Sequence, residues 1–399
     1  MFVFCFPVML AYKTQTFPSC TAVRGGLGRG KKATILPMRL LSLTLESFRN
    51  YPTLELSFGE ENVSVLLGEN ATGKTNVLEA IAVLALLKSP RKAEDSDLVR
   101  WEQTHYRVKG VIRSGGGEEK ALEVVSQTLP RKQRACFING VRTPLQQYIG
   151  ALPLITFTPA DLSLFSGSPS ERRRMIDALL SQVSPTYLQA LTEYERVLKQ
   201  RNALLKAIRE ELEKPSALDI WDEKLSSLGA IITVERLQLF ETLEMTLLRE
   251  VRALGEKPAS AHFTYLRKGS ATKDKDIQKE ILGELLKNRE RDCLILTTSV
   301  GPHRDDWTLS FDSHELSSFA SRGQQRAALL ALLLLQASFL EMRTGEKPLL
   351  LLDDVFSEFD EKHRKALLTA LTGNQVLITA THLEESLRKK ASVIACPMV

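Results

Sequence analysis

The sequence predicts an α/β fold that is divided into two halves by an inserted helical arm. Three observations lead to this prediction. A glycine-rich loop joins an apolar strand to a helix near residue 68, helical periodicity runs from about Ser170 to Leu254, and the apolar run Pro348–Leu352 ends in two acids. We expect four segments: an N-terminal extension at 1–37, the first half of the α/β lobe at 38–168, the arm at 169–285 and the second half at 286–399.

The overall charge does not predict the kind of ligand. The chain has 399 residues with a net charge of +5, but its first 37 residues hold five of the 53 basic side chains and no acid, so the remainder balances 48 against 48. An anion-binding surface must therefore come from local clustering. We interpret residues 1–37 as an appendage and Met38 as the ancestral start. In this stretch the basic residues follow the apolar start, the reverse of a secretory signal.

The cysteines favour a reducing cytoplasm. Five of them lie at wide spacings without a C-x-x-C pair, and no H-E-x-x-H occurs, so the sequence gives no sign of a zinc site. The only metal that we expect is Mg²⁺ carried with a nucleotide. The longest apolar run outside the first residues, Ala327 to Leu335, is too short to span a bilayer.

The first half contains a complete G-x-x-x-x-G-K-T phosphate-binding loop. It follows the apolar strand Val63–Leu67 and opens a helix that we expect to run from Lys74 to Lys88, before Ser89-Pro90. Backbone N–H groups converge on phosphates in such a loop, the lysine reaches the β and γ oxygens, and the threonine hydroxyl faces Mg²⁺. The predicted nucleotide-binding residues are Gly68, Glu69, Asn70, Ala71, Thr72, Gly73, Lys74 and Thr75.

The middle of the chain reads as two long antiparallel helices. Apolar residues recur at helical spacing from Leu188 to Leu212, break at Lys214-Pro215-Ser216 and resume from Trp221. Each helix would be about 40 to 50 Å long. After a charged loop at Lys268 to Lys275, we expect strands again, beginning with Cys293–Thr298 and Trp307–Phe311.

The second half supplies the partners of the phosphate-binding loop. Leu349–Leu352 reads as a buried strand that ends in Asp353 and Asp354, the arrangement called Walker B. We expect Asp353 to hold Mg²⁺ through water and Asp354 to polarise the attacking water.

Ala320–Arg326 resembles the signature motif of ABC-type ATPases, with Ser321, Gly323 and Gln324 at matching places. A plain N-capped core helix is the alternative interpretation. Downstream, Ser357–Asp360 resembles the D-loop of those ATPases. His382 follows the expected strand Gln375–Ile378 at the place of their switch histidine, where it is either a γ-phosphate sensor or incidental.

The order and spacing of these motifs resemble the RecF family from Met38 to near the C-terminus, over about 360 residues. Besides the phosphate-binding loop, the signature and Leu352–Val355, the segments that carry the resemblance are Ser47–Tyr51, Thr158–Leu162, Gly167–Arg174, Gln200–Lys206 and Gly301–Asp306. Two departures matter. Ala160 stands where glutamate is usual in the family, and Asp354 stands where many ABC ATPases have glutamate, although the latter agrees with the RecF pattern.

The resemblance implies an ABC-type P-loop ATPase head that is split by the helical arm. Such proteins form head-to-tail homodimers with ATP, so Ser321 and Gly323 would act on the partner's nucleotide. The dimer would be a clamp on DNA, either single-stranded or gapped duplex, that helps RecR and RecO to load RecA. The resemblance also implies weak, DNA-stimulated ATP hydrolysis that times release.

Basic clusters at Arg91-Lys92, at Arg131, Lys132 and Arg134, and at Arg172-Arg173-Arg174 are either DNA contacts or ion-pair partners. Two other classes stay open: another SMC- or Rad50-like ATPase, and a scaffold that binds ATP without clamp activity. A Rad50- or SMC-type protein would need a much longer coiled coil.

Overall fold

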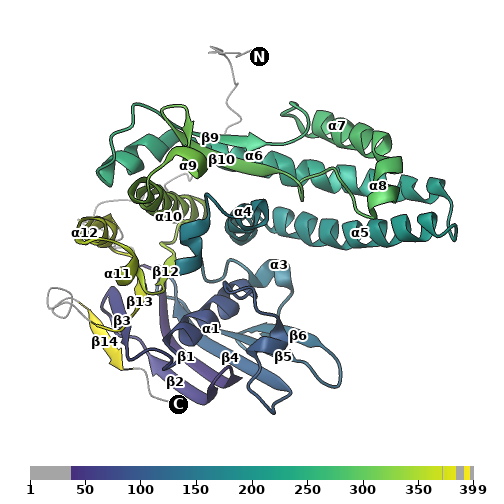
Figure 1. Ribbon diagram of the computed structural model, residues 1–399. Helices are drawn as coiled ribbons and strands as arrows, with labels where there is room; N and C mark the ends of the chain where they lie inside the picture. Colours follow the sequence, from purple (N-terminus) through teal and green to yellow (C-terminus); the bar gives the residue numbers. More distant parts are fainter. Residues whose placement is uncertain (1–36, 371, 383–390, 396–399) are drawn as a thin grey trace, which may run out of the picture. The chain divides into compact units, whose positions relative to one another are not determined.

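The computed structural model describes residues 37–370, 372–382 and 391–395 (Figure 1). These residues belong to one compact unit, Leu36–Val399. The predicted appendage lies outside the described residues except for Pro37.

A parallel sheet forms the centre of the α/β lobe. Its strands are β3 (Val63–Leu67), β8 (Leu154–Phe157), β12 (Leu349–Leu352), β13 (Val376–Ala380) and β14 (Ser392–Ala395), in the order β14-β3-β13-β12-β8. Ile378 of β13 is in register with both Val65 and Leu352. Every pairing is parallel. The carboxyl ends of β3, β13 and β12 therefore lie side by side at one edge of the sheet.

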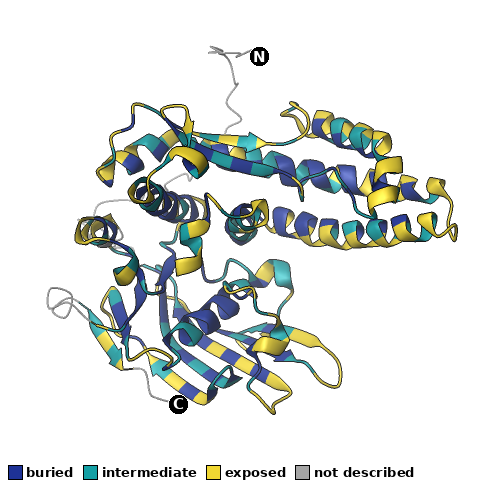
Figure 2. Ribbon diagram, viewed as in Figure 1, coloured by how far each residue is buried: buried dark blue, intermediate teal, exposed yellow. Residues whose placement is uncertain are grey.

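An antiparallel sheet completes the first half. Its strands are β1 (Arg39–Phe48), β2 (Tyr51–Ser57), β4 (His105–Arg113), β5 (Glu119–Gln127), β6 (Gln133–Ile138) and β7 (Val141–Arg142), in the order β2-β1-β4-β5-β6-β7. The short helix α2 (Asp95–Leu98) precedes β4, and the short helix α3 (Leu145–Tyr148) leads from β7 to β8 of the parallel sheet. Helix α1 (Lys74–Leu86) packs against strands of both sheets, and residues Val77 to Ala85 are buried without a break (Figure 2). An apolar surface on all sides is what such a central helix requires.

Five helices occupy the middle of the chain: α4 (Pro169–Val183), α5 (Pro185–Arg209), α6 (Asp219–Ala253), α7 (Asp274–Lys287) and α8 (Arg289–Ile295). Helices α5 and α6 lie side by side and are joined at the predicted break. At 1.5 Å per residue they are about 38 and about 52 Å long. The strand expected at Cys293–Thr298 is wrong, because Cys293–Ile295 ends α8. Leu294 and Ile295 are exposed and give no buried strand face.

The second half adds a small sheet and a core helix. The strands β9 (Ala261–Leu266), β10 (Asp306–Phe311) and β11 (His314–Glu315) pair in the order β11-β10-β9, and α9 (Leu316–Phe319) follows them. Helix α10 (Arg322–Thr344) is the one described helix long and apolar enough to cross a membrane. However, 67% of its apolar window is buried inside the protein, as in a core helix. Helices α11 (Val355–Glu358) and α12 (Glu361–Ala370) complete the described fold.

Candidate nucleotide-binding site

The phosphate-binding loop curls between β3 and α1 as predicted. Gly73 has φ 94°, and a Cβ there would lie 2.4 Å from the Tyr51 hydroxyl, so only glycine fits. Lys74 turns back over the loop, where its amine donates to the carbonyls of Gly68 (2.7 Å) and Glu69 (2.6 Å). The Glu69 carbonyl also accepts from the Thr72 hydroxyl at 2.9 Å. These bonds hold the lysine amine above the loop, where a phosphate oxygen can take their place.

The Ser47–Tyr51 segment supports this loop from the antiparallel sheet. The Tyr51 hydroxyl donates to the Thr72 carbonyl at 3.2 Å. Arg49 forms two 2.8 Å hydrogen bonds to Glu79, which is only 1% exposed. The Ser89 hydroxyl also donates to Glu79. Glu79 and Ser89 were not among the predicted site residues. The signal available was an acid within an otherwise apolar helix, which requires a partner when buried.

Asp353 faces the threonine of the phosphate-binding loop. The Thr75 hydroxyl lies 3.0 and 3.1 Å from its two carboxylate oxygens, although 278 positions separate the two residues. The Thr379 hydroxyl of β13 donates to Asp353 at 2.6 Å and accepts from the Asp354 amide at 2.8 Å. Asp353 is 8% exposed. A hydroxyl and a carboxylate in contact are hard oxygen ligands that fit Mg²⁺. Thr379, which was also absent from the predicted site, is the hydroxyl-bearing residue of the buried strand β13.

Asp354 has an uncommon backbone conformation for a residue other than glycine, with φ 48° and ψ 31°. Its carboxylate accepts from the Ser357 hydroxyl at 2.7 Å. The carboxylate is therefore aimed by the backbone and by one hydrogen bond. Residues held in the left-handed region gather at functional sites, which makes Asp354 a candidate for chemistry.

The signature segment caps α10. The Ser321 hydroxyl accepts from the Gln324 amide at 3.2 Å, and the Gln324 side chain accepts from the Ser321 amide at 3.0 Å. This is a capping box, as the alternative interpretation expected. Ser321 and Gly323 are nevertheless exposed. A Cβ at Gly323 would meet only the Ser321 hydroxyl, at 3.8 Å, so its own chain does not require glycine there.

The D-loop segment lies beside the signature helix. Arg326 of α10 lies 3.6 Å from Glu358, and Asp360 caps α12 by accepting from the His363 amide and ring at 2.8 Å. The His363 amide is the main cause that lowers the pKa of Asp360. His382 is exposed, two residues after β13. It therefore follows the strand that lies between β3 and β12.

Two motifs of the resemblance have structural partners within the fold. In Thr158–Leu162, Asp161 accepts from the Thr158 amide at 2.7 Å and from its hydroxyl at 3.0 Å, and burial raises the pKa of Asp161. The exposed Ala160 beside it has no side-chain oxygen, unlike the glutamate that is usual there. In Gly301–Asp306, Asp306 pairs with Arg172 of α4 at 2.7 and 2.8 Å. The last segment therefore fixes the second half of the lobe to the first helix after residue 168.

The basic clusters are largely engaged in ion pairs. Arg134 donates hydrogen bonds to Asp95 and to the Leu87 carbonyl, and Lys92 forms an ion pair with Glu171. Arg172 is buried and forms an ion pair with Asp306. These side chains are ion-pair partners, as one of the two interpretations expected.

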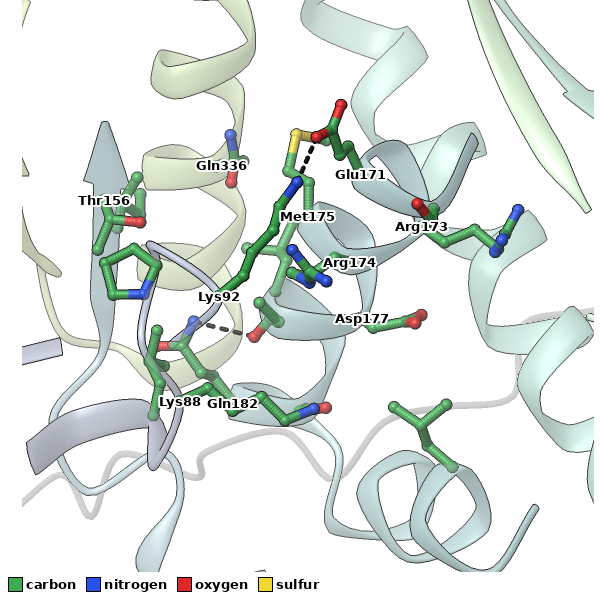
Figure 3. A pocket seen from close by; sticks show the side chains of 18 of the residues that line it. Lys88, Lys92, Thr156, Glu171, Arg173, Arg174, Met175, Asp177, Gln182 and Gln336 are labelled. Carbon is green, nitrogen blue, oxygen red and sulfur yellow. Dashed lines mark hydrogen bonds and ion pairs between the residues drawn. The ribbon is translucent and has the colours of Figure 1, made fainter. Parts of the chain in front are cut away.

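A hollow of about 410 Å³ lies apart from the phosphate-binding loop (Figure 3). Lys92 and Glu171 meet at its rim, while Met175 and Gln336 approach it from α4 and α10. None of the residues 68–75 lines it. Gln182 of α4 bonds both the amide and the carbonyl of Leu154, which satisfies the edge strand β8. The nucleotide site and this hollow are thus different places.

The fold and the site define the class of protein. A phosphate-binding loop and an acid-ended strand meet at the carboxyl edge of a parallel sheet, and a signature-like cap opens a core helix. This is the architecture of an ABC-type P-loop ATPase head, which confirms the predicted fold class.

Comparisons with known proteins give the family. The profile described as RecF/RecN/SMC N terminal domain matches residues 39–398. The DNA replication and repair protein RecF of Enterococcus faecalis is 38% identical over 357 residues, covering 87% of this chain and 93% of the relative. The RecF of Geobacillus thermodenitrificans is 37% identical over 352 residues, covering 87% and 94%. The chain belongs to the RecF family.

Solved structures agree with this assignment. The recombination mediator protein RecF with ATP, from the RecFOR pathway, is 32% identical with a TM-score of 0.82, and the match covers 89% of this chain and 95% of that one. The sequence resemblance is thereby confirmed.

Proposed function

We propose that this chain is an ATP-dependent DNA-binding clamp of recombinational repair and replication restart. It binds single-stranded and gapped duplex DNA and promotes RecA loading together with RecO and RecR, in the cytoplasm. The contact of Thr75 with Asp353 carries the proposal, because it joins the two halves of a nucleotide site across the insertion. Membership of the RecF family supplies the DNA, RecO, RecR and RecA parts.

ATP is held by residues 68–75, with Lys74 on the β and γ phosphates. The Thr75 hydroxyl and the Asp353 carboxylate hold Mg²⁺, which neutralises phosphate charge when bound. Thr379 keeps Asp353 turned toward Thr75 through its 2.6 Å hydrogen bond. Asp354 polarises the attacking water and His382 senses the γ-phosphate.

Ser321, Gly323 and Gln324 act on the ATP of a second copy. The support is that Ser321 and Gly323 are exposed, and that α10 presents the positive end of its dipole there. Two copies that meet head to tail would then enclose two nucleotides. ATP hydrolysis is weak and DNA-stimulated, and it opens the clamp.

Fluorescence anisotropy of a labelled gapped duplex tests the clamp. We expect binding to tighten at least tenfold with ATP and Mg²⁺, and Lys74→Ala to lose this gain because the phosphates lose their cation. Lys120→Ala is the matched control, since Lys120 lies on β5 with Glu118 as its partner.

Three outcomes would contradict the proposal. If neither ATP nor Lys74→Ala changes the affinity for DNA, the protein is not an ATP-dependent clamp. ATP binding without any DNA binding favours the ATP-binding scaffold. If the ATP-bound protein stays a monomer, Ser321 does not act on the nucleotide of a second copy.

A further inference from the structure

One tryptophan is almost fully exposed. Trp101 has 91% of its surface accessible, whereas Trp307 is fully buried and Trp221 is partly buried beneath Lys224. An exposed indole keeps both ring faces accessible, and such a ring can stack on a flat ligand.

The surroundings of Trp101 are basic and polar. Trp101 lies in the 100–104 loop that precedes β4, and the 128–132 loop between β5 and β6 lies beside it. The Thr128 amide and hydroxyl donate to the Thr104 carbonyl at 2.8 and 3.0 Å. Leu129, 62% exposed, is the other large apolar side chain of these loops. Two apolar side chains are too few for the core of a protein interface.

Both loops carry basic side chains. Arg100 precedes Trp101, and Arg131 and Lys132 are exposed on the neighbouring loop. Two acids also lie here: Glu102 follows the tryptophan, and Glu94 is 3.6 Å from Lys132. The 128–132 loop itself has no acid. An aromatic ring beside cations is the combination that stacks a base and holds its phosphates.

The 100–104 loop is attached to the nucleotide site. The Arg100 amide donates to the Ser47 carbonyl at 2.9 Å, and the Arg49 amide donates to the Leu98 carbonyl at 2.7 Å. The same Ser47–Tyr51 segment supports the phosphate-binding loop through Tyr51 and Arg49. The loop that carries Trp101 is therefore hydrogen-bonded to the same segment that supports the phosphate-binding loop.

We propose that Trp101 stacks on an unpaired nucleobase and that the 100–104 and 128–132 loops hold the single strand at the edge of a gap. This proposal rests on the proposed DNA-clamp function and names the residue that recognises the single strand. Bases within a duplex are already stacked on both faces, so a loop indole selects an unpaired or terminal base.

The test uses the emission of Trp101 itself. In a Trp221→Phe background, Trp101 is the exposed emitter, because Trp307 is buried. We expect an oligodeoxythymidylate to quench this emission saturably, while a blunt duplex binds with much less quenching. Trp101→Ala should weaken oligodeoxythymidylate binding roughly tenfold or more, whereas Trp101→Phe should stay within about threefold. Arg131→Ala should weaken binding and reduce its salt dependence by about one phosphate contact.

Each other outcome overturns the proposal in a distinct way. If Trp101→Ala binds oligodeoxythymidylate like the parent while ATP-dependent duplex binding persists, the stacking site is wrong and the clamp stands. If Trp101→Ala instead abolishes the ATP-dependent dimer, the indole is a contact with a second copy. If the parent binds no DNA at all, the proposed function itself fails. Equal urea unfolding midpoints of parent and variant show that the fold is intact.

Discussion

Asp353 and Asp354 are adjacent in sequence but are held in different ways. Asp353 lies between two threonine hydroxyls, and Asp354 stands on a left-handed turn with one serine as its partner. A side chain held by two groups suits a metal ligand that must stay in place. A more exposed carboxylate suits the group that meets water.

Asp354→Asn tests this division. We expect ATP hydrolysis to fall by roughly 10² to 10⁴, because the amide no longer accepts a proton, while ATP binding stays within a few-fold. Asp354→Glu should hydrolyse as fast as the parent or faster, since its carboxylate extends one methylene closer to the water. Single-turnover hydrolysis and nucleotide titration measure the two effects. Unchanged hydrolysis in Asp354→Asn would remove this residue from the chemistry.

His303 and Asp305 predict an unusual pH response. Burial lowers the pKa of His303 to about 4 from 6.5, and burial raises the pKa of Asp305 to about 6 from 3.8. As the pH falls from 6.5 to 4, the histidine takes up its proton more readily in the unfolded chain, which destabilises the fold. As the pH falls from 6 to 3.8, the aspartate takes up its proton more readily in the folded chain, which stabilises the fold.

The two contributions oppose each other in the native protein, so single variants should separate them. When the pH is lowered from 7 to 5, the unfolding free energy of His303→Gln should rise relative to that of the parent. Over the same change, the unfolding free energy of Asp305→Asn should fall relative to that of the parent. Urea unfolding at both pH values measures this difference. One common pH profile for all three proteins would contradict the assignment.

At the scale of elements, the two long helices are joined by a buried charge cluster. Arg201 of α5 is fully buried and bonds Asp222 of α6 at 2.7 Å and Asp292 of α8 at 2.8 Å. The same guanidinium donates to the Thr298 hydroxyl at 2.9 Å. The Gln200–Lys206 motif therefore has a structural role, because its Arg201 joins α5 to α6 and to α8.

Arg201→Ala should therefore cost about 3 to 5 kcal/mol of unfolding free energy, because it leaves the buried carboxylate of Asp292 without its cation and leaves Asp222 with Arg289 alone. Arg196→Ala on the same helix is the matched control. Its partner Glu193 is on the surface, and we expect a loss of at most about 1 kcal/mol. Urea unfolding of both variants is the measurement. Equal losses would mean that the cluster does not hold the arm.

The sequence predicted those parts of the fold that are set by local pattern. Strands β3, β12 and β13, helix α1 and the break before α6 all follow from apolar period and from proline or glycine signals. The G-x-x-x-x-G-K-T pattern predicted residues 68–75 as a nucleotide site, and the apolar strand that ends in two acids predicted Asp353; the structure brings Thr75 and Asp353 into contact. Thr379, Glu79 and Ser89 were missed because their importance depends on partners far along the chain. The strand expected at Cys293–Thr298 was wrong because Asp292, which precedes it in α8, is held by a hydrogen bond from the buried Arg201.

At the scale of the whole molecule, the phosphate-binding loop and the exposed signature cap lie on one chain, and we propose that they complete each other only between two chains. In this proposal, ATP bound to one chain contacts the signature segment of the other, so ATP binding favours the dimer. The 100–104 loop is hydrogen-bonded to the Ser47–Tyr51 segment, which supports the phosphate-binding loop. ATP binding and the proposed single-strand site therefore share this segment.

Sedimentation velocity with and without ATP and Mg²⁺ tests whether two copies enclose the nucleotide. We predict a monomer without nucleotide and a species of twice the mass with ATP. Lys74→Ala and Ser321→Arg should each abolish the dimer, because they act on opposite sides of the same nucleotide. A mass that does not change with ATP, or a Ser321→Arg variant that still dimerises, would contradict the account.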